Sequence, residues 1–328
     1  MTGPPTSKLA DSVAAIVRAA GPHVLALLPR VEERLAAIAQ SHGPQLGLHA
    51  GATIAAGGKR LRPLLVLLAA GPEAPELPAV RAGAAVELVH SATLVHDDVL
   101  DGAQLRRGRP TVVAVAGRGM ATATGDLLFS RAFSELAANG SPDEIRVLSS
   151  ASSALAEGEL MQRADAWNAT TTRERYLARC DLKTARLFQA ACELGALEGG
   201  GPVELLGRFG RRIGLAFQLL DDVLDVSGPA ARTGKHRGTD LLDGTVTLPL
   251  ILARERDPEL ARVDLREVRT PAQAEALCDA IAATGALEAA RADAMEMVAE
   301  AKADLPALPD AQRGALELVA DGVVDRYS

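Results

Sequence analysis

The pentapeptide Asp-Asp-Val-Leu-Asp occurs twice in this chain, at Asp97–Asp101 and at Asp221–Asp225. In an α-helix, residues i and i+4 lie on one face, so the outer two aspartates of each copy point the same way. Clustered carboxylates repel one another unless a cation neutralises them. Their hard oxygen atoms, without paired Cys or His, favour Mg²⁺. Two such clusters facing each other across a helix bundle predict bound divalent metal, with coordination positions left open for phosphate.

Two basic segments accompany the aspartates. Gly57–Pro63 (GGKRLRP) places three cations after two glycines at an expected helix start, where free N–H groups, Lys and Arg together would bind an anion. A solvated basic turn is the alternative. Leu105–Thr111 (LRRGRPT) begins shortly after the first acidic cluster. Metal and guanidinium groups placed so close together suit a polyphosphate.

Lysine is rare in this chain. Among 35 Lys and Arg residues, only five are lysines, and three of these, Lys59, Lys183 and Lys235, lie in segments expected to bind phosphate. The pattern indicates a need for compact ammonium groups at these points, although chance clustering is possible with so few residues.

Composition limits the function classes. The net charge of −7 argues against nucleic-acid binding, which needs a basic surface. No Pro/Gly/Ser linker divides the 328 residues, so we expect a single domain, 1–328, with a loose N-terminal segment over residues 1–20. Cys180, Cys192 and Cys278 lack metal-ligand spacing and are expected to be core thiols in a reducing cytoplasm.

The chain shows no membrane or export signal. Its N-terminus lacks the basic start and apolar run of a signal peptide, and its longest apolar segment, Pro63–Ala70, falls short of the roughly 18 residues that span a bilayer. We therefore expect a soluble, cytoplasmic protein with no transmembrane segment.

The sequence predicts an all-α fold of ten or more helices, because Ala, Leu, Arg and Glu recur at helical spacing and β-branched alternation is almost absent. Helices are expected to start at Ser141-Pro142 and Thr270-Pro271, each with a capping-box pattern. Breaks are expected at 57–58, 199–202 and 227–229. The longest irregular segment, 227–244, follows the second acidic cluster and is expected to be a functional loop.

Six motifs in order carry a family resemblance: GGKRLRP, ELVHSATLVHDDVLD with LRRGRPT, GDLLFSRAF, DLKTA, FQLLDDVLD and GKHRGTDLLDGTVTLP. From Gly57 to Leu250 the chain resembles the trans-isoprenyl diphosphate synthases of the polyprenyl synthetase family, and in particular bacterial long-chain enzymes. The resemblance implies the isoprenoid synthase fold, a single large helix bundle around a central cavity.

The resemblance implies a prenyltransferase that condenses isopentenyl diphosphate head-to-tail with an allylic diphosphate. Ionisation of the allylic diphosphate is followed by attack of the isopentenyl double bond and loss of a proton. By family analogy the released diphosphate is the base, so no side chain is assigned that role.

The resemblance also implies residue roles. The catalytic group is Asp97, Asp98, Asp101, Lys183, Asp221 and Asp222, and Mg²⁺, expected as three ions, is held by Asp97, Asp101, Asp221, Asp225 and Asp240. The allylic diphosphate contacts Arg106, Lys183, Thr184, Gln218 and Lys235, and isopentenyl diphosphate contacts Lys59, Arg62, His90 and Arg107. His96 is expected to pack beside the site. Thr245 stands where the family often has lysine, so one phosphate contact is expected to be missing.

Product length is expected to depend on Ala92 and Thr93, about one helical turn before Asp97. In the family an aromatic side chain here stops elongation, whereas Ala92 leaves the path open. The resemblance implies a tail of about thirty to fifty carbons, with quinone side chains of the menaquinone type as the hypothesis for its use. Phe129 and Phe133 form either a deeper floor or ordinary core packing.

Other functions remain as alternatives. A shorter-chain (geranylgeranyl or farnesyl) synthase and a non-catalytic partner subunit of a heteromeric synthase are the main ones. A terpene cyclase fits less well, because only eight aromatic residues are present to stabilise cyclic cations. A head-to-head synthase has no use for a second, metal-free diphosphate site. The family implies a homodimer that delivers its product to the membrane.

Overall fold

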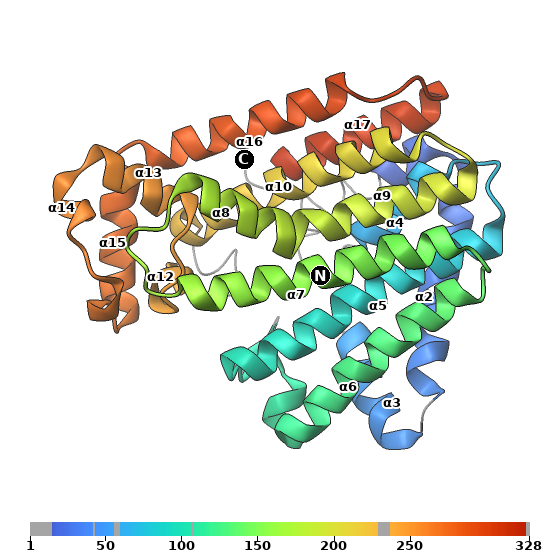
Figure 1. Cartoon of the computed structure of the whole chain (residues 1–328), viewed down its shortest axis with the longest axis horizontal. Helices are drawn as coiled ribbons and strands as arrows, with labels where there is room; N and C mark the ends of the chain where they lie inside the picture. Colours follow the sequence, from blue (N-terminus) through green and yellow to red (C-terminus); the bar gives the residue numbers. More distant parts are fainter. Residues whose placement is uncertain (1–14, 42, 56–59, 107, 229–236, 326–328) are drawn as a thin grey trace, which may run out of the picture. The chain divides into compact units, whose positions relative to one another are not determined.

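The computed structural model describes residues 15–41, 43–55, 60–106, 108–228 and 237–325. It confirms the all-α prediction, since the strands among these residues are the two-residue β1 (Leu105–Arg106) and β2 (Arg109–Pro110), paired antiparallel. The α-helices are α2 (Pro22–Gln40), α3 (Pro44–Ala55), α4 (Leu61–Ala70), α5 (Glu76–Asp101), α6 (Val112–Ala137), α7 (Pro142–Asp165), α8 (Arg173–Cys180), α9 (Arg186–Gly199), α10 (Val203–Ser227), α12 (Thr239–Leu242), α13 (Leu248–Arg256), α14 (Pro258–Ala261), α15 (Pro271–Ala283), α16 (Ala286–Ala303) and α17 (Asp310–Asp325) (Figure 1).

The chain forms two compact units. Unit 1 takes in residues 1–152, 187–210 and 305–319, and unit 2 takes in 153–186, 211–304 and 320–328. A π-helix, Asp181–Ala185, joins α8 to α9, and a 3₁₀-helix covers Leu265–Glu267. The first acidic cluster belongs to unit 1 and the second to unit 2. The single-domain organisation expected from the sequence stays a prediction.

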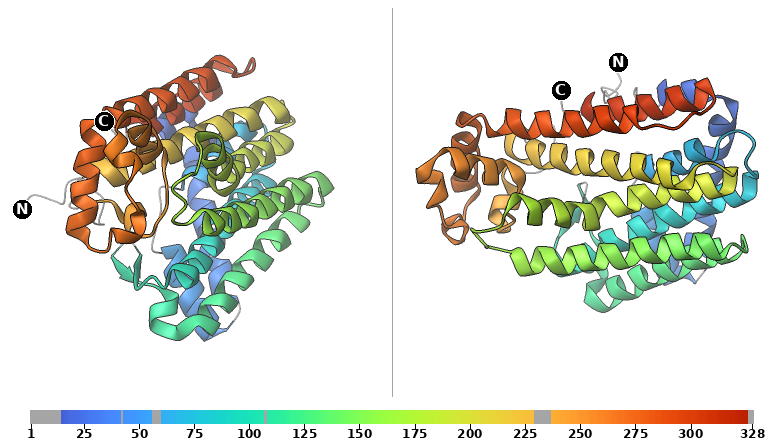
Figure 2. Two further views of the ribbon diagram at one scale, coloured as in Figure 1. Left: turned by 60° about the vertical axis from the view of Figure 1, so that its left-hand side comes forward. Right: turned by 45° about the horizontal axis from the view of Figure 1, so that its top comes forward.

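In unit 1, α5 and α6 lie side by side, and α5 also contacts α2 and α4 (Figure 2). Between Ala79 and Val95, α5 is buried on most of its sides, as expected for a helix that is apolar nearly all round. Gly195 on α9 allows close packing against α4: a Cβ there would lie 2.2 Å from the Val66 carbonyl oxygen. Gly195 thus sets the separation between α9 and α4, the helix that carries Arg62.

In unit 2, α13 packs against α16, and α12 packs against α15. The predicted helix starts are confirmed: α7 begins at Pro142, and α15 begins at Pro271 with a complete Thr270–Gln273 capping box. The segment 227–244 differs from the expected irregular loop, because α12 lies inside it, after Gly238 in a left-handed conformation. Residues 229–236 of that segment lie outside the described residues.

The three cysteines are free and buried, as the sequence predicts, and burial raises the pKa of each thiol. Among the described residues, none of the helices combines the length and hydropathy that a bilayer crossing requires.

Two glutamates of unit 1 meet at Asn139, whose side-chain amide donates to Glu144 (3.1 Å) and to Glu198 (2.9 Å). Glu144 is fully buried. Partial burial, together with the hydrogen bond and charge of Glu144, raises the pKa of Glu198 from 4.5 to about 8. The pair therefore shares a proton at neutral pH.

Glu198→Gln is expected to make the stability of the protein less sensitive to a rise in pH from 4.5 to about 8. Between pH 4.5 and about 8 the folded state holds a proton on Glu198 that the unfolded chain releases, so the wild type loses stability as pH rises through this range. Glutamine keeps the donor to Glu144 without titrating. Urea unfolding should show the difference between the two proteins growing with pH, and a pH-independent difference would contradict the shared proton.

Candidate active site

The first acidic cluster ends α5. Asp101 is exposed and Asp97 half-buried, whereas Asp98 between them is 5% exposed. Arg106 Nε donates to Asp98 Oδ1 at 2.8 Å. The turn after α5 and the β1–β2 hairpin return the chain to the helix end, and this brings Arg106 to Asp98. The structure thus places Arg106 beside the first cluster, while Arg107 lies outside the described residues.

The second acidic cluster lies at the end of α10. As in the first cluster, its middle aspartate is more buried than the outer two. Asp221 and Asp225 are half-buried, and Asp222 is 4% exposed. Both oxygens of Asp222 accept hydrogen bonds, one from Tyr176 Oη (2.7 Å) and one from Gln218 Nε2 (2.7 Å). Burial raises the pKa of Asp222 to about 7, although these two donors oppose the shift. In both copies, therefore, the middle aspartate is buried and held by protein partners, and the outer aspartates are more exposed.

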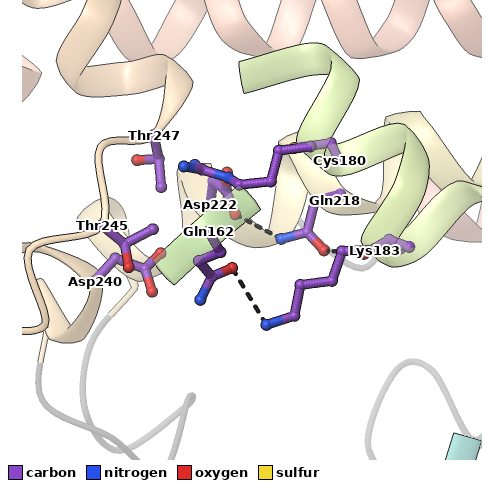
Figure 3. Close-up of a pocket in the computed structure, with 10 residues that line it drawn as sticks. Gln162, Cys180, Lys183, Gln218, Asp222, Asp240, Thr245 and Thr247 are labelled. Carbon is purple, nitrogen blue, oxygen red and sulfur yellow. Dashed lines mark hydrogen bonds between the residues drawn. The ribbon is translucent and has the colours of Figure 1, made fainter. Parts of the chain in front are cut away.

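A pocket of about 180 Å³ in unit 2 gathers several predicted residues (Figure 3). Thr184 Oγ1 donates to Gln218 Oε1 at 2.7 Å, which extends the hydrogen-bond chain from Asp222 to the wall of the pocket. The lining residues are Gln162, Arg179, Cys180, Lys183, Thr184, Gln218, Asp222, Asp240, Thr245 and Thr247. Of the predicted unit 2 residues, Lys183, Thr184, Gln218, Asp222 and Asp240 meet here, and Lys235 lies outside the described residues.

Lys183 sits in the π-helix, a rare geometry that is often found at functional sites. Its Nζ pairs with Glu159. The same Nζ donates to Gln162 Oε1 at 3.2 Å (Figure 3). Gly158 permits this approach, since a Cβ there would lie 2.6 Å from the Lys183 backbone nitrogen. The sequence analysis did not predict roles for Glu159 and Gln162. Their spacing of three residues, about one helical turn, places them on the same face of α7.

The segment after α12 is fixed by Trp167. This residue has a left-handed backbone (φ 63°), and its N–H donates to the Gly244 carbonyl at 2.8 Å. The Trp167 ring covers Gly244 so closely that a Cβ would lie 2.2 Å from it. At the start of α12, the Asp240 backbone N–H donates to Asp225 Oδ2 at 3.3 Å. These contacts hold the pocket residues Asp240 and Thr245 in place.

In unit 1, Arg62 lies 4.5 Å above the centre of the Phe188 ring, and His90 is half-buried on α5. Arg60 pairs with Glu32 and with the buried Glu87 (2.7 Å). Its backbone is left-handed. Lys59 lies outside the described residues.

The residues expected to affect chain length lie on α5. Ala92 is fully buried, and Thr93 Oγ1 donates to the His90 carbonyl at 2.8 Å. His96 stacks on Phe129 with ring centres 5.8 Å apart and pairs with Asp126 at 3.3 Å. The stacking shows that His96 and Phe129 pack against each other.

The acidic donors fit a hard divalent cation. Asp97, Asp101, Asp221, Asp225 and Asp240 supply carboxylate oxygens only. Among the described residues, no group of three His, Cys, Asp or Glu side chains is placed to hold a metal ion. In proteins generally, Mg²⁺ is commonly held by one or two carboxylates, with phosphate and water completing its shell.

Comparison with known proteins finds relatives that are named as prenyl diphosphate synthases. Residues 45–283 match the family model for polyprenyl synthetases. Heptaprenyl diphosphate synthase component 2 of Geobacillus stearothermophilus is 40% identical over 266 residues, covering 80% of this chain and 83% of that protein. Octaprenyl diphosphate synthase of Escherichia coli K12 is 38% identical over 273 residues, covering 80% and 82%. Enzymes named for shorter products also occur among the relatives.

A solved structure agrees over the whole chain. The polyprenyl synthase of Caulobacter crescentus CB15, complexed with calcium and isoprenyl diphosphate, is 36% identical and superposes with a TM-score of 0.86, covering 99% of this chain and 100% of that one.

Gly244→Ala is expected to displace the lone tryptophan. The new Cβ would meet the Trp167 ring, and φ is +72°, so both the ring and the segment must move. Gly200→Ala is the matched control, because its φ is +66° with nothing within 4 Å. Each substitution pays about 1–2 kcal/mol of left-handed strain, but only Gly244→Ala should shift Trp emission. Unchanged emission would contradict the Trp167–Gly244 contact.

Proposed function

The chain belongs to the polyprenyl synthetase family, and from that premise we propose that it condenses isopentenyl diphosphate head-to-tail with an allylic diphosphate to form an all-trans polyprenyl diphosphate. It is a prenyltransferase. The observation that carries the proposal is the unit 2 pocket, where Lys183, Thr184, Gln218 and Asp240 converge from three separate segments. Ammonium, hydroxyl and amide groups of this kind bind phosphate oxygens.

Lys183 is proposed to bind the allylic diphosphate by exchanging partners. In the structure its ammonium group is paired with Glu159, which also accepts from Arg163 Nε at 2.7 Å. When a diphosphate takes Lys183, Glu159 keeps the Arg163 partner and is not left as an unpaired charge. The exchange thus avoids the free-energy cost of abandoning a carboxylate in a partly buried site.

Asp98 and Asp222 are proposed to be positioning residues. Asp98 holds Arg106 at the first cluster, and Asp222 holds Gln218 and, through it, Thr184. Arg106 and Lys235 would complete the allylic site. We propose Lys59, Arg62, His90 and Arg107 for isopentenyl diphosphate, with the Phe188 ring supporting the Arg62 guanidinium.

Divalent metal is used generally in this family. For this chain we propose three Mg²⁺ ions, held by Asp97, Asp101, Asp221, Asp225 and Asp240. When bound, they neutralise charge on the departing diphosphate. The calcium and isoprenyl diphosphate in the Caulobacter crescentus enzyme support this pairing of metal and ligand.

A long product is proposed, of about thirty to fifty carbons by analogy with the heptaprenyl and octaprenyl enzymes. Ala92 is small and fully buried on α5, and an aromatic ring at this position would occupy space that alanine does not. Side chains of menaquinone-type quinones are the proposed use. A geranylgeranyl or farnesyl product is the second candidate, because enzymes named for shorter products are also relatives.

A non-catalytic partner subunit is the rival from another class. One relative is named as component 2 of a synthase, which raises the question of a second chain. The retention of both acidic clusters favours a catalytic chain. We propose a cytoplasmic homodimer in a single-domain fold that hands its product to the membrane.

Product analysis tests the proposal. The purified chain, given farnesyl diphosphate, isopentenyl diphosphate and Mg²⁺, should by itself form products of about thirty to fifty carbons in a mass spectrum. Products that stop at about fifteen to twenty carbons would favour the shorter-chain candidate, and no turnover would favour the partner subunit. Ala92→Phe should shorten the product, because the ring occupies space that the tail needs. An unchanged product from active Ala92→Phe enzyme would place the tail elsewhere.

A further inference from the structure

Arg179 on α8 lines the unit 2 pocket, yet no sequence motif assigns it a role. The residue is 4% exposed, and one of its terminal nitrogens, Nη1, has no hydrogen-bond partner. The other, Nη2, donates to the Val246 carbonyl at 2.6 Å. Its guanidinium carbon lies 5.6 Å from the centre of the Tyr176 ring, which fixes the plane of the group.

The charge of Arg179 is incompletely balanced. Its ion-pair partner is the buried Asp165, with Nη1 and Oδ2 4.0 Å apart, which is beyond hydrogen-bond distance. Asp165 is more closely engaged by Arg175, whose Nε lies 2.6 Å from Oδ1. In the same pocket, both oxygens of Asp222 already accept from Tyr176 and Gln218. A buried cation of this kind is costly unless an anion approaches it.

We propose that Arg179 is a positioning residue for the allylic diphosphate. It fixes the Val246 carbonyl, and hence the neighbouring Thr245 and Thr247, and it supplies positive potential from beneath the pocket. The inference rests on the proposed function and adds to Lys183 a second cation in the unit 2 site. Lys183 is closely paired with Glu159, whereas Arg179 is only distantly paired with Asp165, so a bound anion would complete its charge balance.

If the role of Arg179 were purely structural, it would consist only of the hydrogen bond to the Val246 carbonyl, and the charge of the guanidinium would not matter. Arg179→Gln retains an N–H donor for that carbonyl but removes the charge, whereas Arg179→Lys retains the charge and loses the planar fork. The two substitutions therefore separate the charge from the hydrogen bond.

The test is steady-state kinetics of the full-length chain with Mg²⁺. Arg179→Gln is expected to raise KM for farnesyl diphosphate about tenfold, with KM for isopentenyl diphosphate within about twofold of the wild type. Arg179→Lys should recover most of the affinity for farnesyl diphosphate. An unchanged KM for farnesyl diphosphate in Arg179→Gln, or an equal rise for both substrates, would overturn the proposal.

Arg175→Gln is the matched control. Arg175 is on the same helix and pairs with the same Asp165, but it does not line the pocket. It should raise KM for farnesyl diphosphate far less than Arg179→Gln does, and it should leave KM for isopentenyl diphosphate unchanged. If Arg175→Gln raises KM for farnesyl diphosphate as much as Arg179→Gln does, the effect comes through Asp165 and the proposal fails.

A second variant covers the case in which Arg179→Gln does not fold. Asp165→Asn removes the carboxylate that pairs with Arg179, so KM for farnesyl diphosphate should fall about twofold or more. An unchanged or higher KM would contradict the charge role. Failure of the proposed function itself is distinguishable, because the wild-type chain would then show no prenyl transfer at all.

Discussion

The pocket of unit 2 depends on the buried carboxyl group of Asp222. A buried carboxyl needs hydrogen-bond partners, and those of Asp222 come from different elements, Tyr176 on α8 and Gln218 on α10. Gln218 also accepts from Thr184, so one hydrogen-bond chain joins α8, the π-helix and α10. Loss of either donor would leave one oxygen of this desolvated carboxyl without a hydrogen bond. The arrangement of the phosphate-binding groups therefore follows from satisfying Asp222.

The same division of labour is found at the first acidic cluster. Asp98 is buried at the end of α5 and holds Arg106, while Asp97 and Asp101 lie nearer to solvent. The partners differ, because Asp98 is held by a cation and Asp222 by neutral donors. In each pentapeptide the middle aspartate thus stabilises its surroundings, and the outer two present oxygens on one helix face. The repeated motif combines a structural residue with candidate metal ligands.

Much of this was predictable from local sequence. Apolar runs ending in acidic turns predict buried helices with polar ends, and the Thr270 capping box begins α15 as its pattern indicates. Contacts between distant segments were not predictable, because they depend on tertiary packing. Arg60 is paired with Glu87, the π-helix places Lys183 beside Glu159, and Trp167 covers Gly244. The side chain of Arg179 has no sequence signature, since only the fold shows that it is buried beneath a pocket.

Diphosphate binding through Lys183 in the unit 2 pocket can be tested with a crystal structure of the chain grown with Mg²⁺ and inorganic pyrophosphate. We predict pyrophosphate against Lys183 and Thr184, with the Lys183 ammonium group moved away from Glu159 and Glu159 still paired with Arg163. Pyrophosphate bound elsewhere, with the Lys183–Glu159 pair intact, would contradict it.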